Sequence, residues 1–339
     1  MAVRRQAAGA VLAELSSAPQ RKPASSASRD IVAVMDLGTN TFHLLIATGD
    51  AANPQELYHV TEPVKLGEGG MKDGKLHPAG FERGVKTMQQ FHEQIVAHKA
   101  GHVKAIATSA IRTTSNGADF IDEVKAKTGI AIETIDGEQE ARYIYEGIKA
   151  GKCLSDKNSL ILDIGGGSVE FIIGNAEKIF WKRSFEIGAA RLMDRYHQTD
   201  PIPGHAILEL HDYLDKTLVP FFDAAKDIGI ELLIGSSGSF ETFAEVIERM
   251  DGHDFDLKKN TKYLFDYDKF INVTDWLIES THFDRENTPG IISIRVDMIV
   301  VAAIITRFVM ERLGIKDILM STYSLKEGVM AGMLTLPKK

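Results

Sequence analysis

Two segments of the chain share one pattern, and each predicts a β-hairpin closed by a glycine-containing turn. The segments are 31–46 and 159–173. When Asp36 is aligned with Asp163 (163 − 36 = 127 positions apart), both copies show an apolar run, the acid, a hydrophobic residue and a glycine. A hydroxyl residue follows five positions after each acid, and then a second apolar run begins. Strand, tight turn and returning strand form a hairpin, so the repeat predicts a duplicated, two-domain protein.

The two turns have the composition of a phosphate-binding loop. Glycine supplies the backbone freedom that a tight turn needs, and it lets N–H groups approach an anion without a Cβ in the way. The acid at the end of each first strand can hold a cation or orient a water. The predicted phosphate-binding residues are Gly38, Thr39, Asn40 and Thr41 in the first turn, and Gly165, Gly166, Gly167 and Ser168 in the second.

Composition excludes several classes of protein. The 339 residues are 44% hydrophobic and 25% charged, which is typical of a globular protein with well-formed cores. The formal net charge of −8 disfavours a general nucleic-acid binder. The apolar run from Met298 to Ile305 is far shorter than the roughly 20 residues that span a bilayer. It predicts a buried helix, and we expect no membrane partner.

The single cysteine, Cys153, excludes an internal disulfide framework and fits a reducing compartment. We therefore expect a cytoplasmic protein in which Cys153 is a small, semi-buried hydrophobic residue. The histidines show no spacing typical of a zinc site. Residues 1–29 are rich in Arg, Pro, Ala and Ser, which predicts a disordered tail. The tail resembles an organellar transit peptide in composition, but a cloning artefact explains it equally well, and no function is assigned to it.

Between and beyond the hairpins, strand patterns alternate with helix patterns. Apolar residues at a spacing of three or four predict a helix at 79–99, and Asp136-Gly137 predicts a turn into another helix at Glu138. Alternation of this kind indicates an α/β architecture. After Asp200 the chain is rich in helix patterns, interrupted by a third strand-to-glycine turn at 232–239. The other predicted elements are strands at 103–108 and 130–135 and a helix at 120–127.

Glu140 and Arg112 are the main candidates for chemistry. Glu138 and Glu140 open a predicted helix, where acids are also favoured by the helix dipole alone. In the functional interpretation, Glu140 lies at the mouth of a cleft and is the general base for a water. Arg112 follows a strand end, where it is either a solvated loop charge or a multi-donor phosphate ligand.

Three further residues are interpreted as structural. His43 occupies the position in the first hairpin that Glu170 occupies in the second. Arg295 and Asp297 are two residues apart, and we expect an ion pair between them rather than a catalytic role.

Taken in order, the motifs resemble those of the exopolyphosphatase and guanosine-pentaphosphatase family, a branch of the actin, Hsp70 and sugar-kinase superfamily. The resemblance extends over everything after the N-terminal tail. It rests on the segments 36–46 (DLGTNTFHLLI), 64–69 (VKLGEG), 107–112 (ATSAIR), 137–142 (GEQEAR), 163–170 (DIGGGSVE), 184–192 (SFEIGAARL), 235–238 (GSSG), 295–297 (RVD) and 324–328 (SLKEG).

The resemblance implies an α/β fold of two actin-like (ribonuclease H-like) domains facing across a cleft. Domain I would comprise residues 30–143 and domain II residues 144–323, with a C-terminal helix at about 324–339 packing back on domain I. Each domain would contribute one phosphate turn to the cleft. The cleft is expected to close on ligand binding by a hinge near residues 140–150.

The resemblance also assigns roles to residues. Glu140 would be the base that activates water, and Arg112 would bind the phosphate under attack. Asp163 and Glu170 would hold Mg²⁺ directly or through water, with Asp36 assisting. Hydrolysis of a phosphoanhydride by positioning and charge neutralisation suits these groups.

Two substrates remain open. The first is inorganic polyphosphate, from which an exopolyphosphatase removes terminal phosphate, and the second is guanosine pentaphosphate. A nucleotide-dependent sugar-type kinase and a non-catalytic phosphate sensor are less favoured, and a homodimer is left open. The chain ends before the C-terminal helical domain of longer family members, so processive digestion of long chains is not expected. Lys326 stands where the family usually has arginine, and the sequence gives no interpretation of that change.

Overall fold

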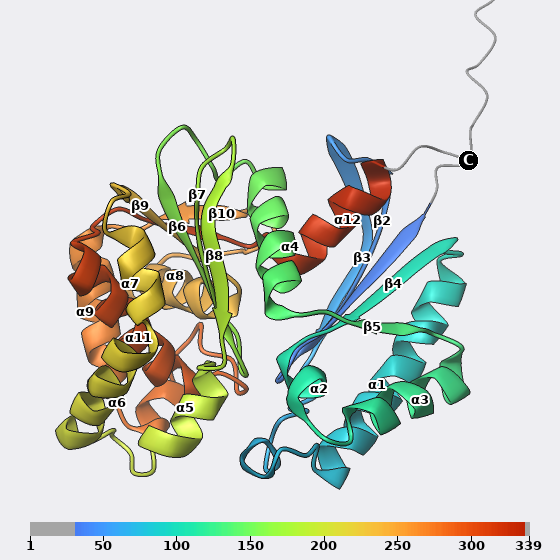
Figure 1. Cartoon of the computed structure of the whole chain (residues 1–339), viewed down its shortest axis with the longest axis horizontal. Helices are drawn as coiled ribbons and strands as arrows, with labels where there is room; N and C mark the ends of the chain where they lie inside the picture. Colours follow the sequence, from blue (N-terminus) through green and yellow to red (C-terminus); the bar gives the residue numbers. More distant parts are fainter. Residues whose placement is uncertain (1–30, 336–339) are drawn as a thin grey trace, which may run out of the picture. The chain divides into compact units, whose positions relative to one another are not determined.

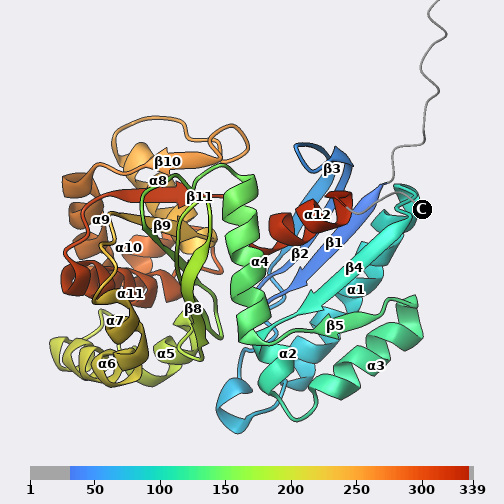
Figure 2. The same cartoon turned by 45° about the horizontal axis from the view of Figure 1, so that its top comes forward.

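The structure is a computed structural model that describes residues 31–335 of the chain. The predicted tail at residues 1–29 lies outside the described residues. The described part contains two β-sheets with helices packed against each (Figures 1 and 2). The prediction of an α/β fold is therefore confirmed.

The first sheet contains both antiparallel and parallel strands. Its elements, with the helices between them, are β1 (Val32–Leu37), β2 (Phe42–Asp50), β3 (Asn53–Glu62), the short 3-10 helix η1 (Met71–Asp73), α1 (Pro78–Ala97), β4 (His102–Ala107), α2 (Ser109–Thr113), α3 (Gly117–Thr128) and β5 (Ile132–Thr134). The strand order is β3-β2-β1-β4-β5. β2 is antiparallel to β1 and β3, whereas β4 is parallel to β1 and β5.

The second sheet repeats this arrangement. After α4 (Gly137–Ala150) come β6 (Ser159–Ile164), β7 (Val169–Gly174), β8 (Ile179–Phe185), α5 (Ala189–Tyr196), α6 (Gly204–Thr217), α7 (Val219–Ala225), β9 (Leu232–Ser236), α8 (Gly238–Met250), β10 (Lys262–Leu264), α9 (Tyr267–Glu279), α10 (His282–Glu286), α11 (Met298–Leu313), β11 (Ile318–Ser321) and α12 (Leu325–Thr335). The strands of the second sheet lie in the order β8-β7-β6-β9-β11, and β10 is added beside β11 at the edge. The first five correspond to β3-β2-β1-β4-β5 of the first sheet, both in their order along the chain and in their directions. The duplication seen in the two hairpins therefore extends to both sheets.

The central strands are buried on both faces, which explains why they read as continuous apolar runs. In β1, Ala33, Met35 and Leu37 belong to the core that the first sheet shares with α1 and α3. The alternate residues Val32 and Val34 face a different core. Successive side chains of a strand point to opposite faces, so a single strand contributes to two cores.

Helices α4 and α12 lie between the two sheets (Figure 2). α4 follows the first sheet in the chain but packs on β7 and β8, whereas α12 follows the second sheet but packs on β1 and β2. One hydrophobic cluster joins both sheets to both helices, and it includes Cys153 as the sequence predicted. The boundary expected between residues 143 and 144 falls inside α4, and the domain limits remain a prediction.

α4 and α12 cross at a point where each helix has a glycine, so that neither has a side chain there. A Cβ on Gly147 of α4 would lie 1.9 Å from the carbonyl oxygen of Ser324. A Cβ on Gly328 of α12 would lie 1.9 Å from the carbonyl oxygen of Tyr143. Both distances are too short for any side chain, so the backbones are in direct contact at this crossing.

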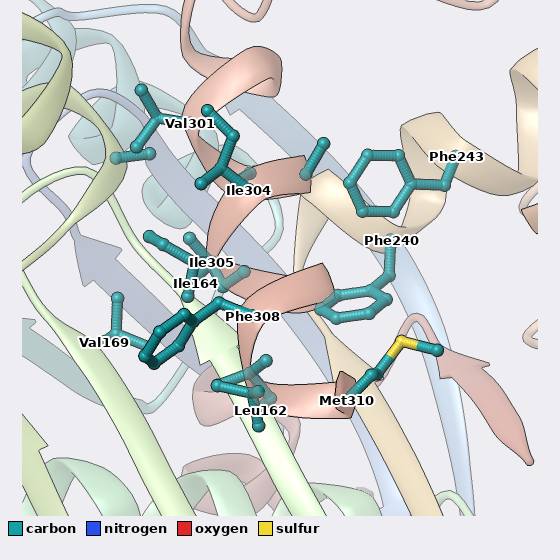
Figure 3. Packing of buried hydrophobic residues seen from close by; sticks show 14 of the residues in the cluster. Leu162, Ile164, Val169, Phe240, Phe243, Val301, Ile304, Ile305, Phe308 and Met310 are labelled. Atoms are coloured by element: carbon teal, nitrogen blue, oxygen red, sulfur yellow. The ribbon is translucent and has the colours of Figure 1, made fainter. Parts of the chain in front are cut away.

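The predicted buried helix at 298–305 is the first half of α11. Its residues Val301, Ile304, Ile305 and Phe308 pack among side chains of the second sheet and of α8 (Figure 3). Among the helices of residues 31–335, none combines the length and the apolar character needed to cross a bilayer.

Candidate active site

The two predicted hairpin turns have the same geometry. We call residues 38–41 turn I and residues 165–168 turn II. Gly38 N–H donates to the Thr41 carbonyl across 3.0 Å, and Gly165 N–H donates to the Ser168 carbonyl across 3.0 Å. The strands that the turns connect also pair alike, since Asp36 lies opposite His43 and Asp163 lies opposite Glu170. The two predicted hairpins and the equivalence of His43 with Glu170 are confirmed.

Both turns line one pocket with a volume of about 160 Å³. Its walls come from the first and the second half of the described chain. The predicted site residues among its lining are Asp36, Gly38, Thr39, Asn40, Thr41, Glu140, Asp163, Gly165, Gly166, Gly167, Ser168 and Glu170. Arg112 does not line the pocket directly, but it is hydrogen-bonded to Glu140, which does.

The turns touch each other, and the contact requires the glycines of turn II. A Cβ on Gly166 would lie 2.1 Å from Asn40 Nδ2, and a Cβ on Gly167 would lie 2.6 Å from Thr39 Oγ1. Any side chain at these two positions would push the walls of the pocket apart. Glycine is therefore needed here for close approach.

Hydrogen bonds to the carbonyls orient the backbone of turn II. The carbonyls of Gly165, Gly166 and Gly167 accept from the N–H groups of Ala189, Ala190 and Gly188, respectively, at 2.8–3.1 Å. In a planar trans peptide the following N–H points opposite to the carbonyl. The N–H groups of Gly166, Gly167 and Ser168 therefore point away from the start of α5, as successive donors for an anion.

Turn I is held in the same way by the loop that follows β3. The carbonyls of Thr39 and Asn40 accept from the N–H groups of Gly67 and Lys65 at 2.9 and 2.7 Å. By the same peptide geometry, the N–H groups of Asn40 and Thr41 point away from that loop. In each turn, hydrogen bonds from the same half of the molecule hold the backbone in place, and the N–H donors are therefore fixed in direction.

Carboxylates gather along the pocket, and burial together with their mutual repulsion raises the pKa of Asp36, Glu140 and Glu170. Burial raises the pKa of Asp36 to about 7, with Lys326 opposing the shift and Asp163 adding to it. Burial also raises the pKa of Glu170 well above its usual range, and Glu140 and Asp163 add to that rise. So much negative charge in a shared desolvated space favours a bound cation.

The carboxylate of Asp163 is fixed by two hydroxyls from distant parts of the chain. Its Oδ2 accepts from Ser236 Oγ at 2.8 Å and from Ser324 Oγ at 2.7 Å. Ser236 ends β9, and Ser324 directly precedes α12. The third glycine turn predicted at 232–239 therefore reaches the same pocket, where Ser237, Gly238 and Ser239 line the wall.

Glu140 is buried and bound to Arg112. Arg112 Nη1 donates to Glu140 Oε2 across 2.8 Å and to the Ile135 carbonyl across 3.2 Å. Burial raises the pKa of Glu140 to about 7, while the guanidinium of Arg112 opposes the rise. A carboxylate with this pKa can take a proton from water near neutral pH.

Glu138, the neighbouring acid, has a different environment. Its side chain is largely exposed and pairs with Lys182, which also donates to the Glu138 carbonyl at 2.8 Å. Asp136 caps the start of α4 by accepting from Gln139 N–H at 2.8 Å. That cap fixes the first turn of the helix, with Glu140 on the buried side and Glu138 on the exposed side.

The expected ion pair between Arg295 and Asp297 is wrong. Arg295 lies 3.8 Å from Glu241 and covers Gly238, where an added Cβ would meet its guanidinium. Asp297 instead pairs with Arg285 and with His282. The two residues are close in sequence, but the backbone directs their side chains to different partners.

Glu186 and Lys326 belong to the site, although the sequence analysis assigned no role to either. Glu186, just after β8, accepts from Arg112 Nη2 at 2.8 Å. Lys326 is buried beside Glu327 at 3.2 Å. Burial lowers the pKa of Lys326, but Glu327, Glu241 and Asp36 outweigh that and raise it above its usual range. Glu186 and Lys326 both fall within motifs noted in the sequence, so those motifs could have pointed to them.

His43, interpreted as structural, bonds within its own sheet. Its ring nitrogens lie 3.0 Å from Thr41 Oγ1 and 2.9 Å from Thr61 Oγ1. Burial lowers its pKa well below the usual range, with the charge of Lys326 adding to the effect. A neutral imidazole that supports the hydroxyl of turn I agrees with that interpretation.

Comparisons with known proteins give one consistent result. The model of the Ppx/GppA phosphatase family matches residues 45–336. The structure is similar to that of an exopolyphosphatase from Cytophaga hutchinsonii, with a TM-score of 0.87 and 40% identity over 90% of this chain and 98% of that one. The Aquifex aeolicus member of the Ppx/GppA family has a TM-score of 0.76 at 23% identity, over 90% and 97% of the two chains. At that identity the second likeness supports the fold alone.

Proposed function

Because the chain belongs to the Ppx/GppA phosphatase family, we propose that it is an Mg²⁺-dependent exopolyphosphatase that removes terminal phosphate from inorganic polyphosphate. The observation that carries the proposal is the ion pair between the buried Glu140 and Arg112, beside two facing turns of N–H donors. The pair supplies a base and a guanidinium, and the turns supply donors for phosphoryl oxygens.

The proposed reaction is a direct attack of water on the terminal phosphorus. The water oxygen forms the new P–O bond while Glu140 takes its proton. The bridging P–O bond breaks, and its electron pair leaves with the shortened chain. Turn I, turn II and Arg112 neutralise charge on the non-bridging oxygens, which is the main source of catalysis in phosphoryl transfer.

The carboxylates fit a magnesium ion that keeps part of its water. Within residues 31–335, no three His, Cys, Asp or Glu side chains come together as a metal-binding group. Mg²⁺ is commonly held by one or two carboxylates together with phosphate oxygens and water. Asp163 and Glu170, with Asp36 nearby, would hold it in this way. Bound there, it would neutralise charge on the phosphate chain.

The lining of the pocket favours polyphosphate over guanosine pentaphosphate. Among its lining residues in the described chain there is no Phe, Tyr or Trp on which a guanine could stack. Arg295, which covers Gly238, and Lys326 instead add two cationic side chains to the lining. A chain of phosphates can use such charges along its length, and the similarity to the Cytophaga hutchinsonii exopolyphosphatase supports the same substrate.

A panel assay tests the proposal. Phosphate release is measured from long polyphosphate, short polyphosphate, guanosine pentaphosphate and ATP, each with and without Mg²⁺. We expect release from polyphosphate that requires Mg²⁺. Faster release from guanosine pentaphosphate would assign the enzyme to the other substrate, and no release from any of the four would point to a phosphate sensor.

A further inference from the structure

The carboxylate of Glu186 is surrounded by three donors that come from both halves of the described chain. Its Oε2 accepts from Ser109 Oγ at 2.6 Å and from Arg191 Nη2 at 2.9 Å, and its Oε1 accepts from Arg112 Nη2 at 2.8 Å. Ser109 and Arg112 lie on α2 of the first half, whereas Arg191 lies on α5 of the second. One internal anion therefore joins α2 to α5.

These donors are continuous with the proposed phosphate site. Arg191 Nε donates to the Gly167 carbonyl of turn II at 3.1 Å. Ser109 packs on the same glycine, since a Cβ there would lie 2.5 Å from its Oγ. Arg112 connects to Glu140 through its other nitrogen. The carboxylate of Glu186 thus occupies a position between turn II and the proposed base.

We propose that Ser109, Arg112 and Arg191 form an anion site for the phosphoryl group that is hydrolysed, and that Glu186 occupies this site when no phosphate is bound. The proposal rests on the proposed function and adds Ser109, Arg191 and Glu186 to it. The ligand is a tetrahedral phosphate oxyanion, bound as the terminal group before attack and as orthophosphate after it.

Charge and geometry decide which anion holds the site. A terminal phosphoryl group offers three oxygens and close to two negative charges, whereas a carboxylate offers two oxygens and one charge. Guanidinium groups bind phosphate through paired donors, so a phosphate group displaces the carboxylate. The side chain of Glu186 is 41% exposed and can swing towards solvent. When orthophosphate leaves, Glu186 returns and competes against its rebinding.

A purely positioning role for Glu186 predicts the opposite result. If Glu186 only held Arg112 and Arg191 in place, its removal would disorder both cations and weaken the binding of phosphate. If Glu186 competes with phosphate, its removal strengthens binding. The sign of the change in phosphate affinity therefore separates the two roles.

The test is calorimetric titration of orthophosphate into the full chain, with and without Mg²⁺, for the wild type and for Glu186→Gln. Glu133→Gln is the matched control, because Glu133 also loses an exposed ion pair, but its partner is Lys104 and not one of the three donors of the proposed anion site. We expect Glu186→Gln to bind orthophosphate about threefold to tenfold more tightly, as expected for the loss of partly exposed ion pairs. Glu133→Gln should bind as the wild type does.

A second variant checks that the gain arises at this site. Adding Arg191→Gln to Glu186→Gln should abolish the gain in affinity. An unchanged or weaker affinity in Glu186→Gln relative to Glu133→Gln would overturn the proposal. The titration measures binding and does not require hydrolysis. If Glu186→Gln bound orthophosphate more tightly but the protein did not hydrolyse polyphosphate, the anion site would be supported and the exopolyphosphatase activity would be rejected.

Discussion

Arg112 donates to Glu140 through Nη1 and to Glu186 through Nη2, both across 2.8 Å, so one guanidinium connects the proposed base to a second acid. The pairing keeps a positive charge next to a carboxylate that burial would otherwise protonate. It also makes the behaviour of Glu140 depend on what else Arg112 binds.

Replacing Glu140 with Gln should lower kcat by two orders of magnitude or more while leaving the fold intact. An amide cannot take a proton from water, and general base catalysis commonly contributes about 10²–10⁴-fold. Phosphate release from polyphosphate measures the effect, with thermal unfolding as the check on folding. Glu138→Gln is the control, because Glu138 is exposed and paired with Lys182. A larger loss in the control would show that the wrong acid has been assigned.

Replacing Arg112 with Lys should impair kcat/KM by about tenfold or more, although the charge is kept. An ammonium is a point charge and cannot bond two carboxylates, or two oxygens of a phosphate, in the geometry of a guanidinium. Steady-state kinetics on polyphosphate measures the change. Kinetics equal to those of the wild type would place Arg112 outside the site.

The pH profile of kcat/KM should have an ascending limb near pH 7. Glu140 must be ionised to accept a proton, and its pKa is raised to about 7, so activity is lost as the pH falls through that value. Arg112 lowers this pKa, so Arg112→Gln should move the limb to higher pH. A limb that stays in place in the variant would mean that the limb reports a different group.

Replacing Gly328 with Ala should destabilise the protein by about 1–3 kcal/mol or more, because the new Cβ would overlap the Tyr143 carbonyl and overpack the helix crossing. Chemical denaturation measures the free energy of unfolding. Gly332→Ala, in the same helix, is the matched control, since an added Cβ there meets nothing within 4 Å. The control should be neutral or more stable by up to about 1 kcal/mol, because alanine favours helix.

The sequence was most informative where the pattern is local. The hairpins, the helix at 79–99 and the buried helix at 298–305 follow from the spacing of apolar residues, and α1 and α11 confirm the two helices. Asp136-Gly137 marked the start of α4 because an N-cap acts within a few residues.

The sequence was least informative where the partner is distant in the chain. Asp163 is fixed by Ser236 and Ser324, which lie 73 and 161 positions away. Glu186 meets Arg112 across 74 positions. Arg295 and Asp297 show the converse error, because neighbours in sequence were expected to pair and do not. Such contacts depend on the order of the strands and on the packing of distant segments, which no local pattern encodes.

The glycine crossing of α4 and α12 has a mechanical consequence for the base. Glu140 and Gly147 are on the same helix, seven residues apart (147 − 140 = 7), which places the carboxylate about 10 Å along the axis from the crossing. If α4 tilted about its side-chain-free contact with α12, Glu140 would move with it. A rotation of about 10° at that contact moves the far end by about 2 Å, and a misplacement of about 1 Å can cost about a hundredfold in rate. A small change in the angle between α4 and α12 would therefore be enough to move the base away from its water.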